Sequence, residues 1–180
     1  MAIKKNITID GIEVPFKASA AVPRLYRLKF RRDIYKDFAS LKTEVTEGDE
    51  NKSEIGIESL EVFENIAYIM AKHADSNVPD NPDDFLEQFN TFSIYEILPQ
   101  LIELWGLNTA TQVESKKKHR QTDRPMTTPL FLLRCKQLGL SMTELDLLTI
   151  GLINDMFTER ENDEYSGWNG VAGQADFDAF

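Results

Sequence analysis

The sequence predicts a mainly α-helical protein: an N-terminal β-hairpin, a helical domain, a linker, and a small helical C-terminal extension with a flexible tail. Three observations lead to this prediction. The turn-forming pair Asp10-Gly11 separates two short apolar stretches, apolar residues then recur at helical spacing up to Trp105, and the basic run Lys116-Lys117-Lys118 precedes a second, shorter helical pattern. We place the four parts at residues 1–115, 116–127, 128–160 and 161–180.

The hairpin prediction depends on Asp10-Gly11, because this dipeptide readily adopts the positive φ angles of a tight turn. Ser19 is then placed to cap one long helix that has Pro23 in its first turn. Apolar residues repeat along this expected helix at Tyr26, Phe30, Ile34, Phe38, Leu41 and Val45. Its other face carries Arg24, Arg27, Arg31, Arg32 and Lys36. This basic face is either plainly solvated or a docking patch for an acidic partner.

Residues 47–56 are polar and charged, which is typical of a loop. A second helix is expected to start near Glu58 and to stop at Asn77-Val78-Pro79, because the residue before a proline disfavours helical geometry. Its expected core stripe consists of Leu60, Phe63, Ala67, Met70 and Ala74, widened by Val62, Ile66 and Ile69.

Two further helices are expected in the first 115 residues. Asp83 or Asp84 opens a short one, since acidic side chains favour helix N-termini. The next is expected over Ser93 to Trp105, with a possible kink at Pro99 and termination at Gly106. Its inward residues are Ile94, Ile97, Leu98, Leu101, Ile102 and Trp105.

Beyond the lysines, a polar linker leads to Pro129, which suits the first turn of a new helix that stops at Gly139. Ser141 and Glu144 have the spacing of a capping box. The inward residues expected around these signals are Leu130, Leu133, Cys135 and Leu138, followed by Leu145, Leu148, Leu152, Ile153, Met156 and Phe157. So small a helical pair buries too little surface to be very stable alone. Residues 161–180 are acidic and weakly patterned, so we expect disorder there in the unbound state.

Charge alternates in blocks along the chain, whose net charge is −10. Residues 1–42 carry ten Lys/Arg against four Asp/Glu, residues 43–114 carry two against sixteen, residues 115–136 carry seven against one, and residues 137–180 carry one against nine. Such blocks favour head-to-tail contact between copies or contact with a patterned partner, although they also fit simple solvation. Nucleic-acid binding is disfavoured, because the acidic remainder would repel phosphate.

The sequence contains no recognisable catalytic, cofactor-binding or metal-binding motif. His73 and His119 stand apart from any Cys or carboxylate at metal-ligand spacing, and Asp80, Asp83 and Asp84 lack the glycine and terminal glutamate of a calcium loop. No Gly-rich phosphate loop or nucleophile motif occurs. Cys135 is expected to be a buried small hydrophobe. The longest apolar stretches are too short for a membrane helix and no signal-peptide pattern is present, so we expect a soluble, intracellular protein with no membrane partner.

Two stretches of the sequence resemble tail assembly chaperones of long-tailed phages and related prophages. The first contains Ile7-Thr8-Ile9-Asp10-Gly11, Val14-Pro15-Phe16-Lys17-Ala18, Ala21-Val22-Pro23-Arg24-Leu25-Tyr26-Arg27 and Phe30-Arg31-Arg32-Asp33-Ile34. The second resembles the extension that these phages add by programmed translational frameshifting, and contains Thr128-Pro129-Leu130-Phe131-Leu132-Leu133-Arg134-Cys135, Leu138-Gly139-Leu140-Ser141, Asp146-Leu147-Leu148-Thr149-Ile150-Gly151 and Asp176-Phe177-Asp178-Ala179-Phe180. The acidic middle of the chain is less diagnostic.

The resemblance implies a non-catalytic assembly factor of the host cell cytoplasm that is absent from the mature virion. The N-terminal domain would coat the tape measure protein in many copies, and the extension would recruit the major tail protein for tail tube polymerisation. Trp168, Phe177 and Phe180 are the candidate contacts to the tail protein, unless they fold back on residues 130–157. The candidates for tape measure binding or self-association are Arg24, Arg27, Arg31 and Arg32.

The same resemblance suggests that Lys116, Lys117 and Lys118 mark a frameshift junction, since lysine codons form A-rich slippery stretches. The alternative is an ordinary basic linker. A rival function is a structural tail completion or connector protein, which would persist in purified virions. An enzyme is the weakest of the three classes, because no convergent set of polar groups emerges from the sequence.

Overall fold

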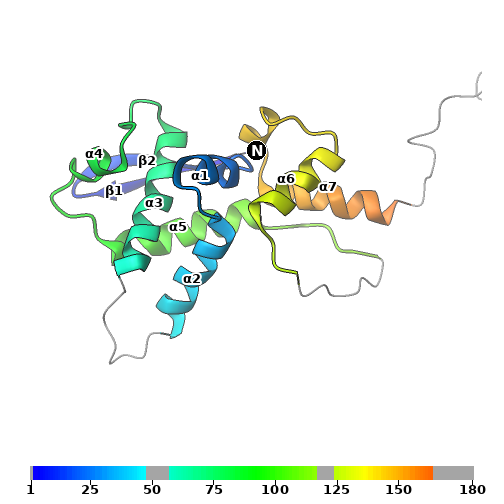
Figure 1. Ribbon diagram of the computed structural model, residues 1–180, viewed down its shortest axis with the longest axis horizontal. Helices are drawn as coiled ribbons and strands as arrows, with labels where there is room; N and C mark the ends of the chain where they lie inside the picture. Colours follow the sequence, from blue (N-terminus) through cyan, green and yellow to red (C-terminus); the bar gives the residue numbers. More distant parts are fainter. Residues whose placement is uncertain (1, 48–56, 117–123, 164–180) are drawn as a thin grey trace, which may run out of the picture.

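The computed structural model describes residues 2–47, 57–116 and 124–163, and it confirms a mainly α-helical protein with an N-terminal β-hairpin. The elements in chain order are β1 (Ile3–Ile9), β2 (Ile12–Ala18), α1 (Val22–Phe30), α2 (Ile34–Glu47), α3 (Ile57–Ala74), α4 (Pro82–Leu86), α5 (Ile94–Thr109), α6 (Thr128–Gln137), the 3-10 helix η1 (Glu144–Asp146) and α7 (Ile150–Asn162). Figure 1 shows the hairpin and α3 toward one end of the long axis, α6 and α7 toward the other, and α5 running between them.

The hairpin forms as expected around Asp10 and Gly11, whose φ angles are 50° and 77°. The strands pair antiparallel with Ile7 opposite Val14. Because side chains alternate across a strand, one face of the hairpin is apolar and buried, with Ile7, Ile9, Val14, Phe16 and Ala18 on it. This face packs against α3 and α5.

The prediction of a single long helix after the hairpin is wrong, because the helix is interrupted between α1 and α2. Arg31 adopts a left-handed conformation with φ 60° and its N–H caps α1 by donating to the Arg27 carbonyl. Asp33 then starts α2, since its carboxylate accepts the N–H of Tyr35 at 3.2 Å. Ser19 is not the helix cap either: Ala21 occupies that position without a side-chain hydrogen bond.

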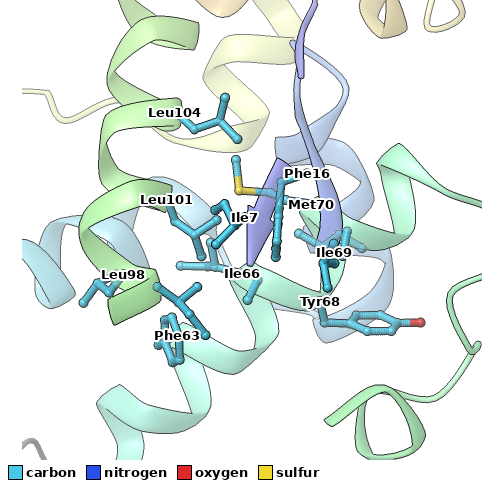
Figure 2. Close-up of a cluster of buried hydrophobic side chains, with 14 of the residues drawn as sticks. Ile7, Phe16, Phe63, Ile66, Tyr68, Ile69, Met70, Leu98, Leu101 and Leu104 are labelled. Carbon is cyan, nitrogen blue, oxygen red and sulfur yellow. The ribbon is translucent and has the colours of Figure 1, made fainter. Parts of the chain in front are cut away.

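The main hydrophobic core lies where the hairpin, α3 and α5 meet (Figure 2). Helix α3 is central, and its stretch from Ile66 to Ala71 is entirely buried. Figure 2 shows Ile7 of the hairpin beside Leu101 of α5, and Phe16 beside Met70 of α3. As expected, α3 starts beside Glu58 and ends before Val78.

The other two predicted boundaries in this region need correction. Helix α4 is capped by Asn81, which accepts the N–H of Asp83 at 3.4 Å, so the aspartates lie in its first turn and do not open it. Helix α5 continues through Gly106 to Thr109. Glycine ends a helix where the chain needs a positive φ, and Gly106 shows none. Pro99 lies inside α5.

Helices α6 and α7 and η1 form a second hydrophobic cluster that also includes Ala20 and Ala21 from the start of the chain. Gly139 ends α6 with φ 80°, as predicted. Ser141 and Glu144 form the predicted reciprocal capping box, but it opens only the short η1. Of the apolar residues expected inside α6, Cys135 is buried whereas Leu133 is 54% exposed, and the fully buried Phe131 was missed.

The four-part division stays a prediction, because residues 117–123 of the expected linker and 164–180 of the expected tail lie outside the described residues. Within the described ranges, every helix is too short or too polar to cross a lipid bilayer.

Candidate interaction surfaces

The four candidate arginines of the basic face do not form one patch. Arg24, Arg27 and Arg31 line a hollow of about 250 Å³ together with Leu28 and with Leu132 of α6. We call this the arginine hollow. Its wall combines α1 of the N-terminal part with α6 of the extension. Arg24 and Arg27 share one side of α1 because they are three positions apart, and Arg31 follows directly at the end of that helix.

The guanidinium groups of the arginine hollow differ in their partners. Arg27 lies 3.6 Å from the Asp33 carboxylate. Among the described residues, Arg24 and Arg31 form no ion pair, and the Nε of Arg24 is shielded from solvent without a hydrogen-bond acceptor. Leu28 beside them is 57% exposed. The hollow therefore presents positive charge next to an exposed apolar side chain.

Arg32 lies apart from the arginine hollow and serves a buried polar network. Its guanidinium donates to Asp37 at 2.8 Å and 3.2 Å and approaches Glu58 at 3.5 Å, and the Tyr26 hydroxyl donates to the same Asp37 at 2.6 Å. Burial raises the pKa of Tyr26, and the hydrogen bond to Asp37 raises the pKa of Arg32. This network joins α1, α2 and α3, so Arg32 has a structural use that its place on the basic face did not indicate.

Asp33 links the arginine hollow to the extension. Besides Arg27 and the N–H of Tyr35, its carboxylate accepts the backbone N–H of Thr128 at 2.9 Å. A carboxylate at a helix N-terminus is favoured because the first N–H groups lack intrahelical partners. Here one side chain serves the first turns of both α2 and α6.

The contact between residues 2–116 and residues 128–163, which we call the seam, includes two backbone hydrogen bonds. Ala2 donates to the Leu147 carbonyl at 2.9 Å, and Ala20 donates to the Leu148 carbonyl at 2.8 Å. The buried Asn108 of α5 adds a bridge, since its amide accepts the N–H of Ile150 at 3.3 Å and faces the Ser19 carbonyl at 3.4 Å. Tyr35 and Trp105 pack against both hydrophobic clusters.

One side of α7 holds the backbone that follows α5. Asp155 accepts the N–H groups of Gln112 and Val113 at 3.0 Å, and Asn162 pairs with the backbone of Glu114 and Lys116 at 2.9 Å and 2.7 Å. Asp155 and Asn162 lie two turns apart and therefore on the same side of the helix. Of the predicted junction, only Lys116 lies within the described residues; Lys117 and Lys118 lie outside them.

Sequence reasoning missed the seam residues Asn108, Asp155 and Asn162. Asn108 and Asp155 are polar residues within apolar helical patterns, which is the one signal that could have indicated a buried partner, whereas Asn162 stands among charged residues and carries no such signal. Their partners are backbone groups 42 to 89 positions away, which no local pattern reveals.

Ser19, His73 and Asp146 come together at the seam, but not in the geometry of a catalytic triad. Both the Ser19 hydroxyl, at 2.8 Å, and the Asp146 carboxylate, at 4.0 Å, approach the same Nε2 of His73. In a triad the hydroxyl and the carboxylate face opposite ring nitrogens. Ser19 is fully buried and also accepts the N–H of Ala21. Burial, with Lys17 nearby, lowers the pKa of His73 to about 4, so its ring is neutral at pH 7.

The described residues contain no group of three or more His, Cys, Asp or Glu side chains suited to a metal ion. Cys135 is buried as expected, and burial raises the pKa of its thiol to about 11. Trp168, Phe177 and Phe180, the candidate contacts to the tail protein, lie outside the described residues.

No protein-family model, no curated protein and no solved structure matches this chain.

Proposed function

We propose that this chain is a phage tail assembly chaperone that binds the tape measure protein and recruits the major tail protein for tail tube polymerisation. It acts in the host cell cytoplasm, in several copies, by reversible adhesion without chemical conversion of a substrate. The proposal starts from the two sequence stretches that resemble this family.

The observation that carries the proposal is that those two stretches meet in space. Ala21 of the first stretch shares a buried cluster with Phe131 and Ile150 of the second, together with the neighbouring Ala20 and Leu145. The backbone bonds of Ala2 and Ala20 to the extension lie at the same place. An extension added to a chaperone domain needs a surface of that domain to pack against, since the small helical pair of the extension alone buries too little apolar surface.

The surface chemistry supports adhesion to protein partners. Large apolar side chains remain exposed on several elements, among them Leu28 at 57%, Tyr95 at 67% and Leu107 at 52%. Exposed apolar side chains cover the apolar face of a partner helix, and basic groups such as those of the arginine hollow select an acidic partner. Binding of this kind is reversible, as release from a growing tube requires.

Capture experiments with coexpressed tape measure and tail proteins test the division of labour. The full chain is expected to retain both, and a chain without residues 119–180 is expected to retain the tape measure protein but lose the tail protein. Because that truncation also uncovers the seam, a second variant replaces Trp168, Phe177 and Phe180 by Ala and leaves the described residues untouched. Unchanged tail-protein capture by both variants would contradict the proposal.

Purified virions separate the proposed chaperone from a structural tail completion or connector protein. We expect the chain to be absent from finished particles, because a chaperone leaves as the tube grows. Its stoichiometric presence in them would favour the structural alternative.

The junction at Lys116, Lys117 and Lys118 is tested by the nucleotide sequence. We expect a slip-prone heptamer and an overlapping reading frame at these codons. Their absence would leave the run as an ordinary basic linker.

A further inference from the structure

We propose that the arginine hollow is the docking site of the chain's own C-terminal segment, residues 164–180. This inference concerns a contact within one molecule and goes beyond the chaperone role proposed above, because it needs no tape measure or tail protein. It follows from the partners that the hollow lacks, from the chemistry of the segment and from its length.

Two of the three arginines in the arginine hollow have no ion-pair partner among the described residues. The Nε of Arg24 is inaccessible to water and has no partner among the described residues, and an unsatisfied buried donor costs free energy. Arg31 also has no ion pair in the described part of the chain, whereas Arg27 is already close to Asp33. A ligand that brings carboxylates would therefore give Arg24 and Arg31 ion-pair partners that the described residues do not provide.

The hollow is also partly apolar. Leu28 is 57% exposed and Leu132 of α6 lies across from it. With a volume of about 250 Å³, the space lies below the roughly 300–1,000 Å³ of typical small-molecule sites. It suits one large apolar side chain flanked by carboxylates. Aromatic rings are favoured here because a guanidinium group also packs on an aromatic face.

Residues 164–180 have this chemistry. The segment carries Glu164, Asp176 and Asp178, contains no Lys or Arg, and places Phe177 between its two aspartates. An Asp-Phe-Asp unit offers one ring for the apolar floor and two carboxylates for Arg24 and Arg31. Charge complementarity thus favours this segment as the occupant.

The chain is long enough for an intramolecular contact. Helix α7 has 13 residues and is about 20 Å long. The stretch from Glu164 to Asp176 also has 13 residues and spans up to about 45 Å when extended. The segment can therefore return along α7 and cross α6, which provides Leu132, to reach α1.

Docking would place Phe177 in the arginine hollow and away from other proteins. A tail protein that uses Phe177 would then have to displace the segment first. The contact would thus keep the candidate binding aromatics covered until a partner competes for them.

Amide hydrogen exchange of residues 164–180 in the purified full chain tests the proposal. We expect exchange in the wild type to be about tenfold slower than in the double variant Asp176→Asn/Asp178→Asn, which is the scale of one hydrogen bond to a charged group. This variant leaves every described residue unchanged, so misfolding does not explain its effect. The double variant Arg24→Gln/Arg31→Gln is expected to lose the same protection, and Lys36→Gln, a charge removed outside the hollow, is expected to keep it.

A charge exchange and a dilution series complete the test. Combining Arg24→Glu and Arg31→Glu with Asp176→Lys and Asp178→Lys is expected to restore protection that each pair alone removes. Protection is expected to stay constant on dilution. Equal exchange in the wild type and the Asp176→Asn/Asp178→Asn variant would overturn the proposal, and so would protection that disappears on dilution, because the contact would then join two copies. The purified chain alone is used, so failure here leaves the proposed chaperone function untouched.

Discussion

Gly151 of α7 lies directly against the backbone of Ala110: a Cβ atom at Gly151 would be 1.8 Å from the Ala110 carbonyl oxygen. No side chain fits at that distance, so the close approach of α7 to the end of α5 requires glycine. Asp155, one turn further along α7, binds the backbone just beyond Ala110. The extension therefore docks through a close backbone contact in addition to apolar burial.

Replacing Gly151 by Ala is expected to lower the free energy of unfolding by about 1–3 kcal/mol, because the methyl group must displace backbone. Urea denaturation followed by circular dichroism measures this change. Gly106→Ala is the matched control: no atom lies within 4 Å of a Cβ there, and Gly106 is inside α5. That control is expected to be stabilising by about 0.5–1 kcal/mol. Equal effects of the two substitutions would contradict the proposed contact.

Replacing Asp155 by Ala is expected to cost about 1–3 kcal/mol, because the N–H groups of Gln112 and Val113 lose their acceptor. Amide exchange at these two residues is expected to speed up more than exchange in the hairpin. Glu159→Ala, one turn further along α7 and exposed, is expected to change stability by less than about 0.5 kcal/mol. If exchange at Gln112 and Val113 were unaffected by Asp155→Ala, the carboxylate would not hold this stretch.

Replacing Phe131 by Ala is expected to destabilise the extension by about 3–5 kcal/mol, because Phe131 is fully buried in the second hydrophobic cluster and the substitution leaves a cavity. Limited proteolysis within residues 128–163 reports the loss. Leu133 is two positions away on α6 and 54% exposed. Leu133→Ala is expected to be nearly neutral, and a larger effect at Leu133 than at Phe131 would show that the docking of α6 is wrong.

Acidification is expected to weaken the fold through His73. Its pKa is about 4 in the folded protein against an ordinary 6.5, mainly because burial disfavours the charged ring. The unfolded chain therefore binds a proton at a higher pH than the folded chain does, so stability falls as pH drops from about 6.5 to about 4.

The variant His73→Gln isolates this contribution, because the amide keeps a polar partner for Ser19 and does not titrate. Urea midpoints of the wild type are expected to fall more steeply than those of His73→Gln over the same pH range. The carboxylates are common to both proteins, so the difference between the two curves reports the His73 ring. Parallel curves would show that His73 titrates normally.

Local signals predicted most of the elements correctly. The Asp10-Gly11 turn, the start of α3 near Glu58 and the end of α6 at Gly139 follow from backbone preferences that depend on a few adjacent residues. The prediction of one long helix after the hairpin failed because the apolar repeat outweighed any local signal for a break. The apolar repeat from Tyr26 onward continues across the break at Arg31, and nothing in that repeat reveals a left-handed residue.

The interaction surfaces were less predictable than the elements. The basic face was visible as five cations at helical spacing, but the break before α2 separates Arg32 from Arg24, Arg27 and Arg31. Leu132 joins those three from a helix about a hundred positions later. The composition of the arginine hollow therefore depends on how α6 docks onto α1.

Composition, turn residues and helical periodicity were enough to establish a mainly α-helical chain with an N-terminal hairpin, because hydrogen bonding and burial within each element involve near neighbours. Those patterns did not predict how the extension packs on the N-terminal part. It depends on contacts such as Gly151 with Ala110 and Asp155 with Gln112, which join residues about 40 positions apart. Such contacts form only once the helices have packed, because the backbone groups of residues 110–113 carry no local signal of which residue of α7 will meet them.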